Sequence, residues 1–352
     1  MAYTNIDDPS AHFQTTTYTG SNNQSITNDG NSDLKPDFVW IKRRSNADHH
    51  SLTNSSLGVN KQLLSSSSNA EQSRTDQIQS FNTDGFTLGI DGAGYTNVAG
   101  NTYVAWQWKA NGGTTASNTS GSITSTVQAN TDAGFNIVTY TGNGANSNFG
   151  HGMGEQPDMV IVKNRTSAAN WCVWHKDLTS SYYLQLDTTN SQQSGPWDGL
   201  DPSSGVVYIY SGGLVNASGS DYVAYIFKGK QGYSKFGSFV GNGNDNGPFV
   251  YTGFKPAFVL MKITTSAGYY WRLLDTTRST SNESGFFLMP NNTDAEFNGL
   301  LHSSHIGIDF LSNGFKIRSS HPIINESGST SIYMAFAENP FTTSTGVPTT
   351  AR

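Results

Sequence analysis

The stretch KPDFVWIK at residues 35–42 decides the fold of this chain, because two close copies of it follow. The second copy is QPDMVIVK at residues 156–163, and the third is KPAFVLMK at residues 255–262. Each copy is a proline followed by an apolar run that stops at a lysine. Short apolar runs bounded by turn residues are typical of buried strands. Proline suits the first position of a strand, where no ladder donor is needed.

Other repeated phrases flank these copies in the same order each time. An aromatic-Thr/Val-Gly unit precedes the proline at residues 18–20, 140–142 and 239–241. A Tyr-Val/Met-Ala-aromatic phrase follows it at residues 103–106, 222–225 and 333–336. Two copies also share Phe-x-x-x-Gly-Phe, at residues 81–86 and 310–315, where Asp-Gly and Asn-Gly predict tight turns between strands.

The repeat is roughly 100 residues long, which is the size of an independent domain. It exceeds the roughly 20–50 residues of solenoid and propeller repeats. We therefore interpret the chain as three tandem domains and not as one closed ring of repeats. The predicted boundaries are residues 1–110, 132–230 and 231–341 for the three repeats, 111–131 for a Gly/Ser/Thr-rich linker, and 342–352 for a Thr-rich C-terminal tail. The tail is expected either to be free or to dock on a neighbouring subunit.

Composition favours a sheet-rich protein with many turns. Only 13% of residues are charged, whereas 12% are aromatic, and Ser, Thr, Asn and Gly are abundant. Few charges argue against long solvent-facing helices, and no stretch has helical periodicity. We predict an all-β fold of three antiparallel β-sandwiches of the jelly-roll or lectin-like type.

Charge and hydropathy exclude several classes of protein. The net charge is −6 and no basic stripe is present, which argues against nucleic-acid binding. A run of about 18 apolar residues is absent, so no transmembrane helix and no membrane insertion are expected. The N-terminal residues lack a signal-peptide pattern, which favours synthesis in a cytoplasm. The single cysteine, Cys172, excludes an intrachain disulfide and is predicted to be a small buried hydrophobic residue.

The sequence contains no specific catalytic or metal-binding motif. His49 and His50 are expected in a solvated turn. His302 and His305 lack a neighbouring carboxylate or cysteine cluster. The segment NGNDNG at residues 242–247 resembles a calcium loop but lacks the closing Glu, so a turn is the simpler interpretation. We predict no catalytic, metal or cofactor-binding residues and no cofactor, and the ligand-binding residues stay unknown.

Two residue types leave sugar chemistry open. Asp37 and Asp158 occupy the same place in two copies, but the third copy has Ala257, so no carboxylate is common to all three. Trp171, Trp174 and Trp271 follow the repeated proline in copies two and three. Such rings stack on sugars, but more often they fill the core of a sandwich.

All three repeats, and the middle one most strongly, resemble a repeat of virion proteins from tailed, especially marine, bacteriophages. The resemblance is carried by GSITSTV at residues 121–127, AGFNIVTYTGNG at 133–144, GHGMG at 150–154, PDMVIVKNR at 157–165, WCVWH at 171–175 and YMAFAENPF at 333–341. Copies one and three lack the Gly-His-Gly unit. The resemblance implies tail fibres, appendages or head-surface proteins with lectin-like sandwiches, and it brings no catalytic residues.

The expected function is therefore that of a non-enzymatic structural protein of a tailed phage particle, located in the virion and involved in host-surface attachment. Other virion proteins are the expected partners, together with host-surface glycans. A homo-oligomer is expected, with a trimer favoured. Two alternatives stay open: a carbohydrate-binding module, and a glycan-degrading tailspike enzyme with two carboxylates in one groove.

Overall fold

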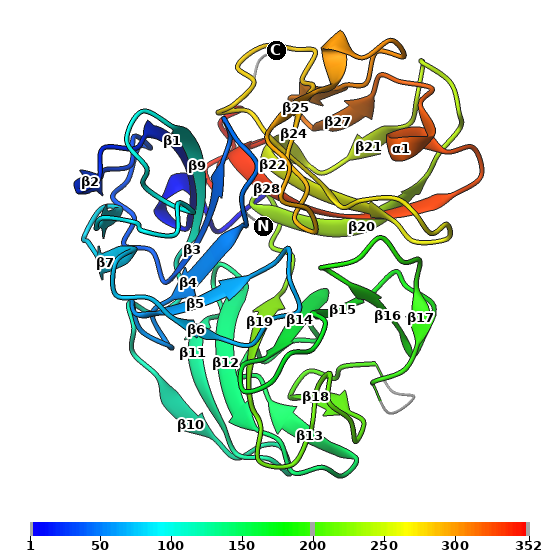
Figure 1. The fold of residues 1–352 in the computed structure, drawn as a ribbon. Coiled ribbons are helices and arrows are strands. Elements are labelled where there is room, and N and C mark those ends of the chain that lie inside the picture. The colour runs from blue at the N-terminus through cyan, green and yellow to red at the C-terminus, as the bar shows by residue number, and fades with distance from the viewer. Residues whose placement is uncertain (1–2, 198–200, 350–352) are drawn as a thin grey trace.

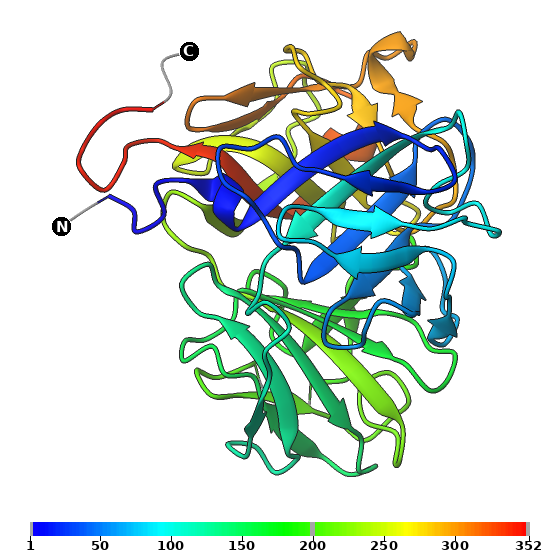
Figure 2. The same cartoon turned by 90° about the vertical axis from the view of Figure 1, so that its left-hand side faces the viewer.

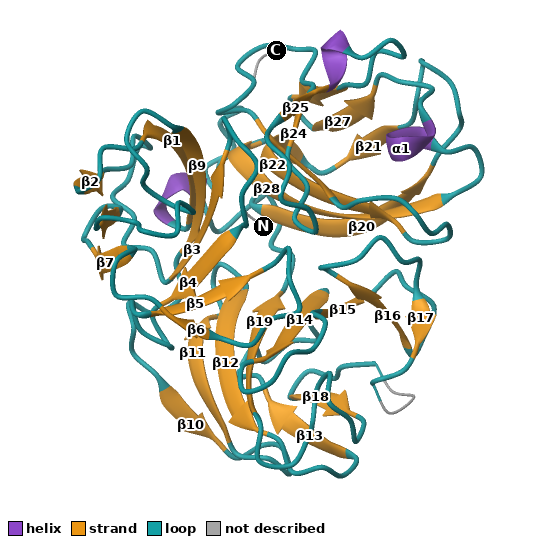
Figure 3. Ribbon diagram, in the orientation of Figure 1, coloured by secondary structure: helices purple, strands orange, loops and turns teal. Residues whose placement is uncertain are grey.

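Antiparallel sheets make up nearly all of the regular structure (Figure 3). The computed structural model describes residues 3–197 and 201–349. Helical structure in these residues is limited to short turns at η1 (Pro9–Ala11), η2 (Gly299–Leu301) and α1 (Pro322–Asn325). None of these is long and apolar enough to cross a membrane. The prediction of an all-β fold is confirmed.

Repeat 1 forms one large and one small sheet. The large sheet has the order β1-β9-β3-β4-β5-β6, with β1 (Phe13–Thr19), β9 (Thr102–Trp108), β3 (Phe38–Arg43), β4 (Ser51–Asn54), β5 (Lys61–Leu64) and β6 (Gln72–Ser73). The small sheet has the order β2-β8-β7, with β2 (Gln24–Ile26), β8 (Phe86–Leu88) and β7 (Ile78–Phe81).

Repeat 2 follows the same plan with additional strands. Its large sheet has the order β10-β11-β12-β19-β14-β15-β16-β17, with β10 (Ala116–Asn118), β11 (Ser125–Asn130), β12 (Phe135–Thr141), β19 (Asp221–Phe227), β14 (Met159–Asn164), β15 (Cys172–His175), β16 (Tyr182–Gln185) and β17 (Gln193–Ser194). Its small sheet pairs β13 (Ser147–Gly150) with β18 (Val206–Ile209).

Repeat 3 has a shorter large sheet. The order is β20-β28-β22-β23, with β20 (Ser234–Val240), β28 (Thr330–Pro340), β22 (Phe254–Ile263) and β23 (Arg272–Asp275). Its small sheets are β21-β27-β26, with β21 (Phe249–Tyr251), β27 (Gly314–Ile317) and β26 (Ile308–Leu311), and the pair β24 (Phe286–Phe287) and β25 (Phe297–Asn298).

The repeated phrases lie side by side in every large sheet. The aromatic-Thr/Val-Gly unit lies on or directly after one strand of each repeat, here the opening strand, and the Tyr-Val/Met-Ala-aromatic phrase, here the closing phrase, lies on the last strand. In each large sheet the strand of the closing phrase runs between the opening strand and the strand of the apolar phrase. These are β9 between β1 and β3, β19 between β12 and β14, and β28 between β20 and β22. The sequence repeat is therefore the triple-stranded centre of each large sheet.

Side-chain alternation gives each large sheet two buried faces, since successive residues of a strand point to opposite sides. In the closing phrase of repeat 1, Tyr103 and Ala105 pack into a core of that repeat alone, and Val104 and Trp106 face the opposite side. The same division occurs at residues 222–225 and 333–336. Each repeat therefore has its own outer core between its large and small sheets.

The inner faces of the three large sheets share one central core. Figure 1 shows the repeats as three lobes around this centre, coloured blue to cyan, green, and yellow to red. Phe38 of repeat 1 stacks on Tyr225 of repeat 2 with ring centroids 4.4 Å apart. Phe336 of repeat 3 lies 6.2 Å from Phe227 of repeat 2 and 5.0 Å from Phe13 of repeat 1. All three repeats touch one another, so the repeats close into a ring.

Two details of the predicted organisation differ from the structure. The interpretation that excluded a closed ring is wrong, because the apolar strands are buried on both faces and the inner faces need one another. The segment 111–131, predicted to be a Gly/Ser/Thr-rich linker, contains β10 and β11, which belong to the large sheet of repeat 2. Strand β11 pairs with β12 from Ser125↔Tyr140 to Asn130↔Phe135. The domain boundaries themselves stay a prediction.

The two predicted glycine turns are confirmed, for different reasons. Gly85, between β7 and β8, has φ +85°, which side-chain-bearing residues rarely adopt. Gly314 begins β27, where a Cβ would lie 2.1 Å from the carbonyl oxygen of Val250. Glycine is needed at the first site for its backbone conformation, and at the second because the neighbouring strand leaves no room for a side chain.

The described part of the C-terminal tail folds back on the N-terminal segment. Both ends of the described chain lie on the same side of the molecule (Figure 2). The backbone N–H of Ser344 donates to Asp7 at 2.6 Å, and the ring of Tyr3 lies 6.3 Å from that of Phe341. Docking of the tail on a neighbouring subunit stays a prediction.

Candidate functional site

The lysine that ends each apolar phrase is buried. Lys42 and Lys163 are 0% exposed and Lys262 is 1% exposed. Each ammonium donates to the carbonyl of the next residue, at 2.6 Å, 2.8 Å and 2.8 Å respectively. Burial lowers the pKa of all three lysines to about 8, because the charged form loses its hydration. Such a pKa suits a general base, but these ammonium groups hold backbone carbonyls inside the fold.

Each of these lysines lies where one repeat meets the next. At each junction a loop of one repeat forms backbone hydrogen bonds with the segment after the lysine of its neighbour. The donor–acceptor pairs are Glu71→Arg165 (2.9 Å) and Ala169→Ser68 (2.9 Å) between repeats 1 and 2, Gln192→Thr264 (2.8 Å) and Gly268→Thr189 (2.9 Å) between repeats 2 and 3, and Glu296→Arg44 (2.9 Å) and Asp48→Thr293 (2.6 Å) between repeats 3 and 1. The repetition of this pattern gives the ring a pseudo-threefold order.

Each junction also contains one buried side chain with an aromatic ring, Trp or His, which we call the ring residue of that junction. The indole N–H of Trp171 donates to the carbonyl of Leu64 at 2.9 Å, and that of Trp271 donates to the carbonyl of Gln185 at 2.9 Å. The corresponding residue of repeat 1 is His50, whose imidazole lies beside the backbone of Met289. The tryptophans of this position belong to the central core. Their interpretation as core residues, in preference to a sugar platform, is confirmed.

The junction of repeats 3 and 1 contains a buried ionic network. Asp275 and Arg278 are 0% exposed at their side chains and form an ion pair of 2.6 Å. Arg278 also pairs with Glu296 at 2.9 Å, and the indole N–H of Trp106 donates to Asp275 at 2.9 Å. Glu296 accepts further from Arg44 at 2.8 Å, and these arginines lower its pKa against the effect of burial. The carboxylates of Asp275 and Glu296 therefore bind side chains that hold repeats 3 and 1 together.

A fourth repeated phrase, Asn-x-x-Gly, escaped the sequence analysis. It occurs at residues 97–100, 216–219 and 325–328, shortly before each closing phrase. The asparagine is buried in all three copies. The opening glycine is the last residue of the aromatic-Thr/Val-Gly unit in each repeat. The asparagine side-chain oxygen accepts the N–H of the residue after it, from Ser21 at 3.1 Å, Asn143 at 2.8 Å and Asn242 at 2.9 Å. We call this contact the asparagine clasp. The constant Asn-x-x-Gly spacing was the signal that could have revealed it.

Glycines complete this asparagine clasp. Gly100, Gly219 and Gly328 have φ between +73° and +77°, and they donate to the opening glycines at 2.9 Å, 2.8 Å and 2.9 Å. A Cβ on the opening glycines, Gly20, Gly142 and Gly241, would lie 2.2 to 2.3 Å from a carbonyl oxygen. The repeated glycine is therefore required by backbone contact. The clasps hold exposed loops rich in Asn, Gly and Ser at the rim of each lobe.

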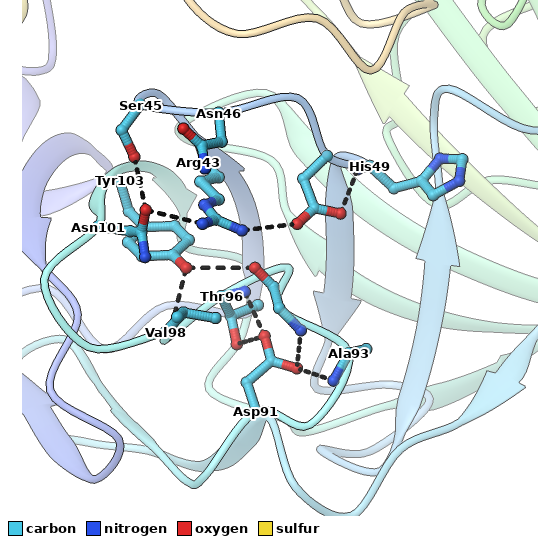
Figure 4. Close-up of polar contacts among 12 residues, drawn as sticks. Arg43, Ser45, Asn46, His49, Asp91, Ala93, Thr96, Val98, Asn101 and Tyr103 are labelled. Carbon is cyan, nitrogen blue, oxygen red and sulfur yellow. Dashed lines mark hydrogen bonds and ion pairs between the residues drawn. The ribbon is translucent and has the colours of Figure 1, made fainter.

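The loop before β9 is organised by a single carboxylate (Figure 4). One oxygen of Asp91 accepts the N–H groups of Ala93 at 3.0 Å and Gly94 at 3.1 Å. The other accepts the N–H of Thr96 and, at 2.9 Å, its hydroxyl. The phenol of Tyr103 then donates to the carbonyl of Gly94 at 3.2 Å. Repeat 1 thus uses this acid to shape the loop.

The two matching aspartates also have structural roles. Asp37 accepts the N–H of Ala110 and of Gly112, both at 2.8 Å, and Asp158 accepts that of Gly229 at 2.7 Å. Each carboxylate therefore holds the start of the connection to the following repeat.

The remaining candidates from the sequence do not converge. His50 is fully buried and accepts from the indole of Trp40 at 2.9 Å, so the prediction of a solvated turn is wrong there. His305 pairs with Glu283 at 3.0 Å, and His302 lies against His321 with ring centroids 5.2 Å apart. Within residues 3–197 and 201–349, no three His, Cys, Asp or Glu side chains form a cluster able to hold a metal ion.

Two further predictions about single residues are confirmed. Cys172 is fully buried in the outer core of repeat 2, and burial raises the pKa of its thiol. The segment 242–247 forms a turn on its asparagine clasp, with Asn325 donating to Asn242 and to the carbonyl of Asn244, both at 2.9 Å. Trp174 lies in the same outer core as Cys172.

Among the hollows between repeats in the described part of the chain, two are considered as ligand sites because of their lining. A groove of about 880 Å³ between repeats 1 and 3 is lined mainly by hydroxyl and amide side chains, including Thr15, Thr17 and Asn282. A pocket of about 340 Å³ between repeats 2 and 3 is lined by lysines and tyrosines, including Lys176, Lys235, Tyr3 and Tyr251. The first hollow is polar and the second is cationic.

A family model described as a domain of unknown function, DUF7483, matches residues 8–340. The chain belongs to the DUF7483 family. The match covers all three repeats, so the DUF7483 unit is the whole ring and not one lobe. None of the curated proteins matches the chain, and none of the solved structures does.

Proposed function

We propose that this DUF7483 chain is a non-enzymatic structural protein of a tailed phage particle, at the tail or on the head, and that it takes part in attachment to the host surface. The observation that carries the proposal is the structural use of its conspicuous polar groups. The buried lysines, the Asp275–Arg278 pair and the Asn-x-x-Gly clasps all serve ring closure or loop shape.

The three lobes support this role physically. We take each lobe as a lectin-like β-sandwich domain, and the ring as a rigid block that presents exposed loops at its rim. The inner faces of the three large sheets cover one another, so the apolar strands are shielded from water although the chain has few charged residues. Other virion proteins are the proposed partners, and the proposed assembly is a homo-oligomer, with a trimer favoured.

Electron microscopy of purified phage particles tests the proposal. Particles are labelled with gold-conjugated antibodies raised against this chain, and unrelated particles serve as the control. Labelling of heads or of tails is the expected result, and it also decides between the two locations. Particles that contain the coding sequence but carry no label on either would refute the proposal.

The polar groove between repeats 1 and 3 favours a second candidate, recognition of host glycans. Its lining of Ser, Thr and Asn side chains offers the hydroxyl and amide groups that pair with sugar hydroxyls. Binding on a glycan array without release of shorter products supports recognition. Release of shorter sugars would instead support the tailspike-enzyme alternative.

A further inference from the structure

The pocket between repeats 2 and 3 owes its form to a short connection. Residues 228–233 lead directly from β19 toward β20, and residues 229–232 of this connection form one wall. The hollow measures about 340 Å³. Tyr3 closes it from the N-terminal segment, Tyr251 from β21, and Lys235 from β20. Three separate parts of the chain therefore converge on one cavity, whose volume lies at the lower end of the roughly 300–1,000 Å³ of small-molecule sites.

Positive charge is concentrated around this pocket. Lys176 and Lys228 both approach the same carboxylate, Asp158, at 3.4 Å. Lys230 pairs with Glu155 at 2.7 Å. Lys235 donates to the carbonyl of Tyr251 at 2.9 Å, and this neutral acceptor does not cancel the positive charge of the lysine. Four lysines and two carboxylates leave an excess of two positive charges here, in a chain whose net charge is −6.

Two of these lysines repel each other. Partial burial and the charge of Lys176 both lower the pKa of Lys235. An anion placed between the two ammonium groups would remove this repulsion and would form charge-assisted hydrogen bonds. The geometry therefore favours a negatively charged ligand over a neutral one.

An aromatic surface lies beside the cations. Tyr251 is 51% exposed, which is unusual for so large a ring in this chain. The ammonium of Lys235 lies 5.0 Å from the centroid of its ring. The hydroxyl of Tyr3 donates to the carbonyl of Gly253 and so holds the pocket's edge in place. An exposed aromatic ring next to cations and phenols suits a sugar ring, whose apolar face stacks while its substituents form hydrogen bonds.

Repeat 1 shows that the fold does not require Lys176. The N–H of Lys176 donates to the carbonyl of Asp158 at 3.0 Å, and at the equivalent point the N–H of Ser55 donates to the carbonyl of Asp37 at 2.8 Å. The Ser55 hydroxyl donates to the Asp37 carboxylate at 2.6 Å. A serine thus completes the same contact without charge, so the fold tolerates an uncharged residue at this place.

We propose that the pocket bounded by Tyr3, Lys176, Lys230, Lys235 and Tyr251 binds an acidic saccharide, with a carboxylate or phosphate between Lys176 and Lys235 and the sugar ring against Tyr251. The inference rests on the proposed role in host-surface attachment and specifies the class of glycan. Binding is non-covalent, and its strength falls as salt screens the lysines.

Titration calorimetry on the full chain tests this site. The probes are an oligogalacturonate, a sugar phosphate, a neutral oligosaccharide of matched length, and inorganic phosphate. The two acidic sugars distinguish carboxylate from phosphate as the anion. We expect at least one acidic sugar to bind, the neutral sugar to bind at least about tenfold more weakly, and inorganic phosphate to bind weakly, because it lacks the ring that stacks on Tyr251.

Variants locate the binding in the pocket. Lys176→Ser, which installs the residue of repeat 1, and Lys235→Met should each weaken binding of the acidic sugar about tenfold, the loss expected from one charge-assisted hydrogen bond. Tyr251→Ala should weaken the sugar but not inorganic phosphate. Lys35→Met is the matched control, since it removes an exposed lysine of repeat 1, and it should leave the affinity within about twofold.

Several results would overturn the proposal. These are equal affinity for the neutral sugar, no heat with either acidic sugar, inorganic phosphate binding as tightly as the sugars, or unchanged affinity in folded Lys176→Ser and Lys235→Met proteins. Unchanged circular dichroism confirms that the variants are folded. Failure here with gold label on the particles would leave the virion role intact, whereas binding without label would leave an acidic-sugar site on a protein of another kind.

Discussion

The junction of repeats 3 and 1 and the junction of repeats 2 and 3 use the same backbone contacts with different side chains. In the first, Arg44 and Glu296 form a bidentate pair, and the buried Arg278 adds to it. In the second, the residues at the positions of Arg44 and Glu296 are Thr264 and Gln192, which carry no charge. The ring residue also changes, from His50 in the first to Trp271 in the second.

This difference shows which contacts define the ring. The two backbone hydrogen bonds and the buried lysine recur at all three junctions, so they set the geometry. Ion pairs and ring residues vary, so they adjust the stability and the specificity of each junction. Distinct junctions also favour one order of the three repeats around the ring, because a repeat placed against the wrong neighbour would leave charges unpaired.

The largest effect is expected from Arg278→Met at the junction of repeats 3 and 1. Removal of the guanidinium leaves Asp275 buried without its charged partner, which costs about 3–5 kcal/mol. Chemical denaturation measures the loss of unfolding free energy. The control is Arg318→Met, in a more exposed pair with Asp309, where less than about 1 kcal/mol should be lost. Equal losses in the two variants would show that the network does not distinguish this junction.

Trp271→His converts the ring residue of one junction to that of the other. The smaller ring leaves unfilled volume in the central core, and a loss of roughly 2–3 kcal/mol is expected from such a truncation. Thermal denaturation gives the shift in Tm. The reverse change, His50→Trp, tests whether the first junction has room for an indole. A stabilised His50→Trp protein would mean that the two junctions are interchangeable, contrary to our comparison.

The buried lysines give a pH dependence common to all junctions. Their folded pKa of about 8 lies below the unfolded value of 10.5, so between these pH values the unfolded chain binds more protons. Burial of the charged lysines therefore destabilises the folded chain at low pH, and this penalty shrinks as pH increases from about 8 toward 10, by on the order of 1–2 kcal/mol for each lysine. Buried tyrosines with raised pKa, such as Tyr225 and Tyr333, oppose this above their unfolded pKa of 10.0.

Denaturation in buffers from pH 7.5 to about 9.5 measures this slope. Lys262→Met should remove about a third of it, since three equivalent lysines contribute. The acids near Lys42, which are Asp48, Asp294 and Glu296, and Asp187 near Lys163 raise the pKa of those lysines, whereas Arg272 lowers that of Lys262. An unchanged slope in Lys262→Met would show that the lysines lie in a wetter environment than the structure indicates.

The smallest effect concerns the ion pair between repeats 1 and 2. Replacement of Arg165 by Thr and of Glu71 by Gln makes this junction resemble that of repeats 2 and 3. The pair is bidentate and partly exposed, so the double variant should lose only about 0.5–1 kcal/mol. The salt dependence of stability should weaken with it. A loss as large as that of Arg278→Met would mean that this partly exposed pair contributes as much as the fully buried one.

Much of the fold was predictable because the repeat itself reports it. The apolar phrases at 38–41, 159–162 and 258–261 form the central strands, and the Asp-Gly and Asn-Gly turns lie where they were expected. The ring was missed, since a continuous apolar strand shows that both faces are buried without showing what covers them. The strand β11 was missed because Ser, Thr and Gln are ambiguous without the partner strand. His50 was misassigned because its polar neighbours conceal its burial.

Sequence alone determined that three equivalent units exist, that they are built of antiparallel strands, and that glycine and proline mark their turns, because these features depend on local backbone chemistry and on a period written in the chain. Tertiary structure alone decided that the units share one core, that lysines are buried at the junctions, and that lysines from two repeats meet tyrosines in one pocket. These outcomes depend on which surfaces approach one another, and that approach is set by packing between residues up to 337 positions apart in the chain.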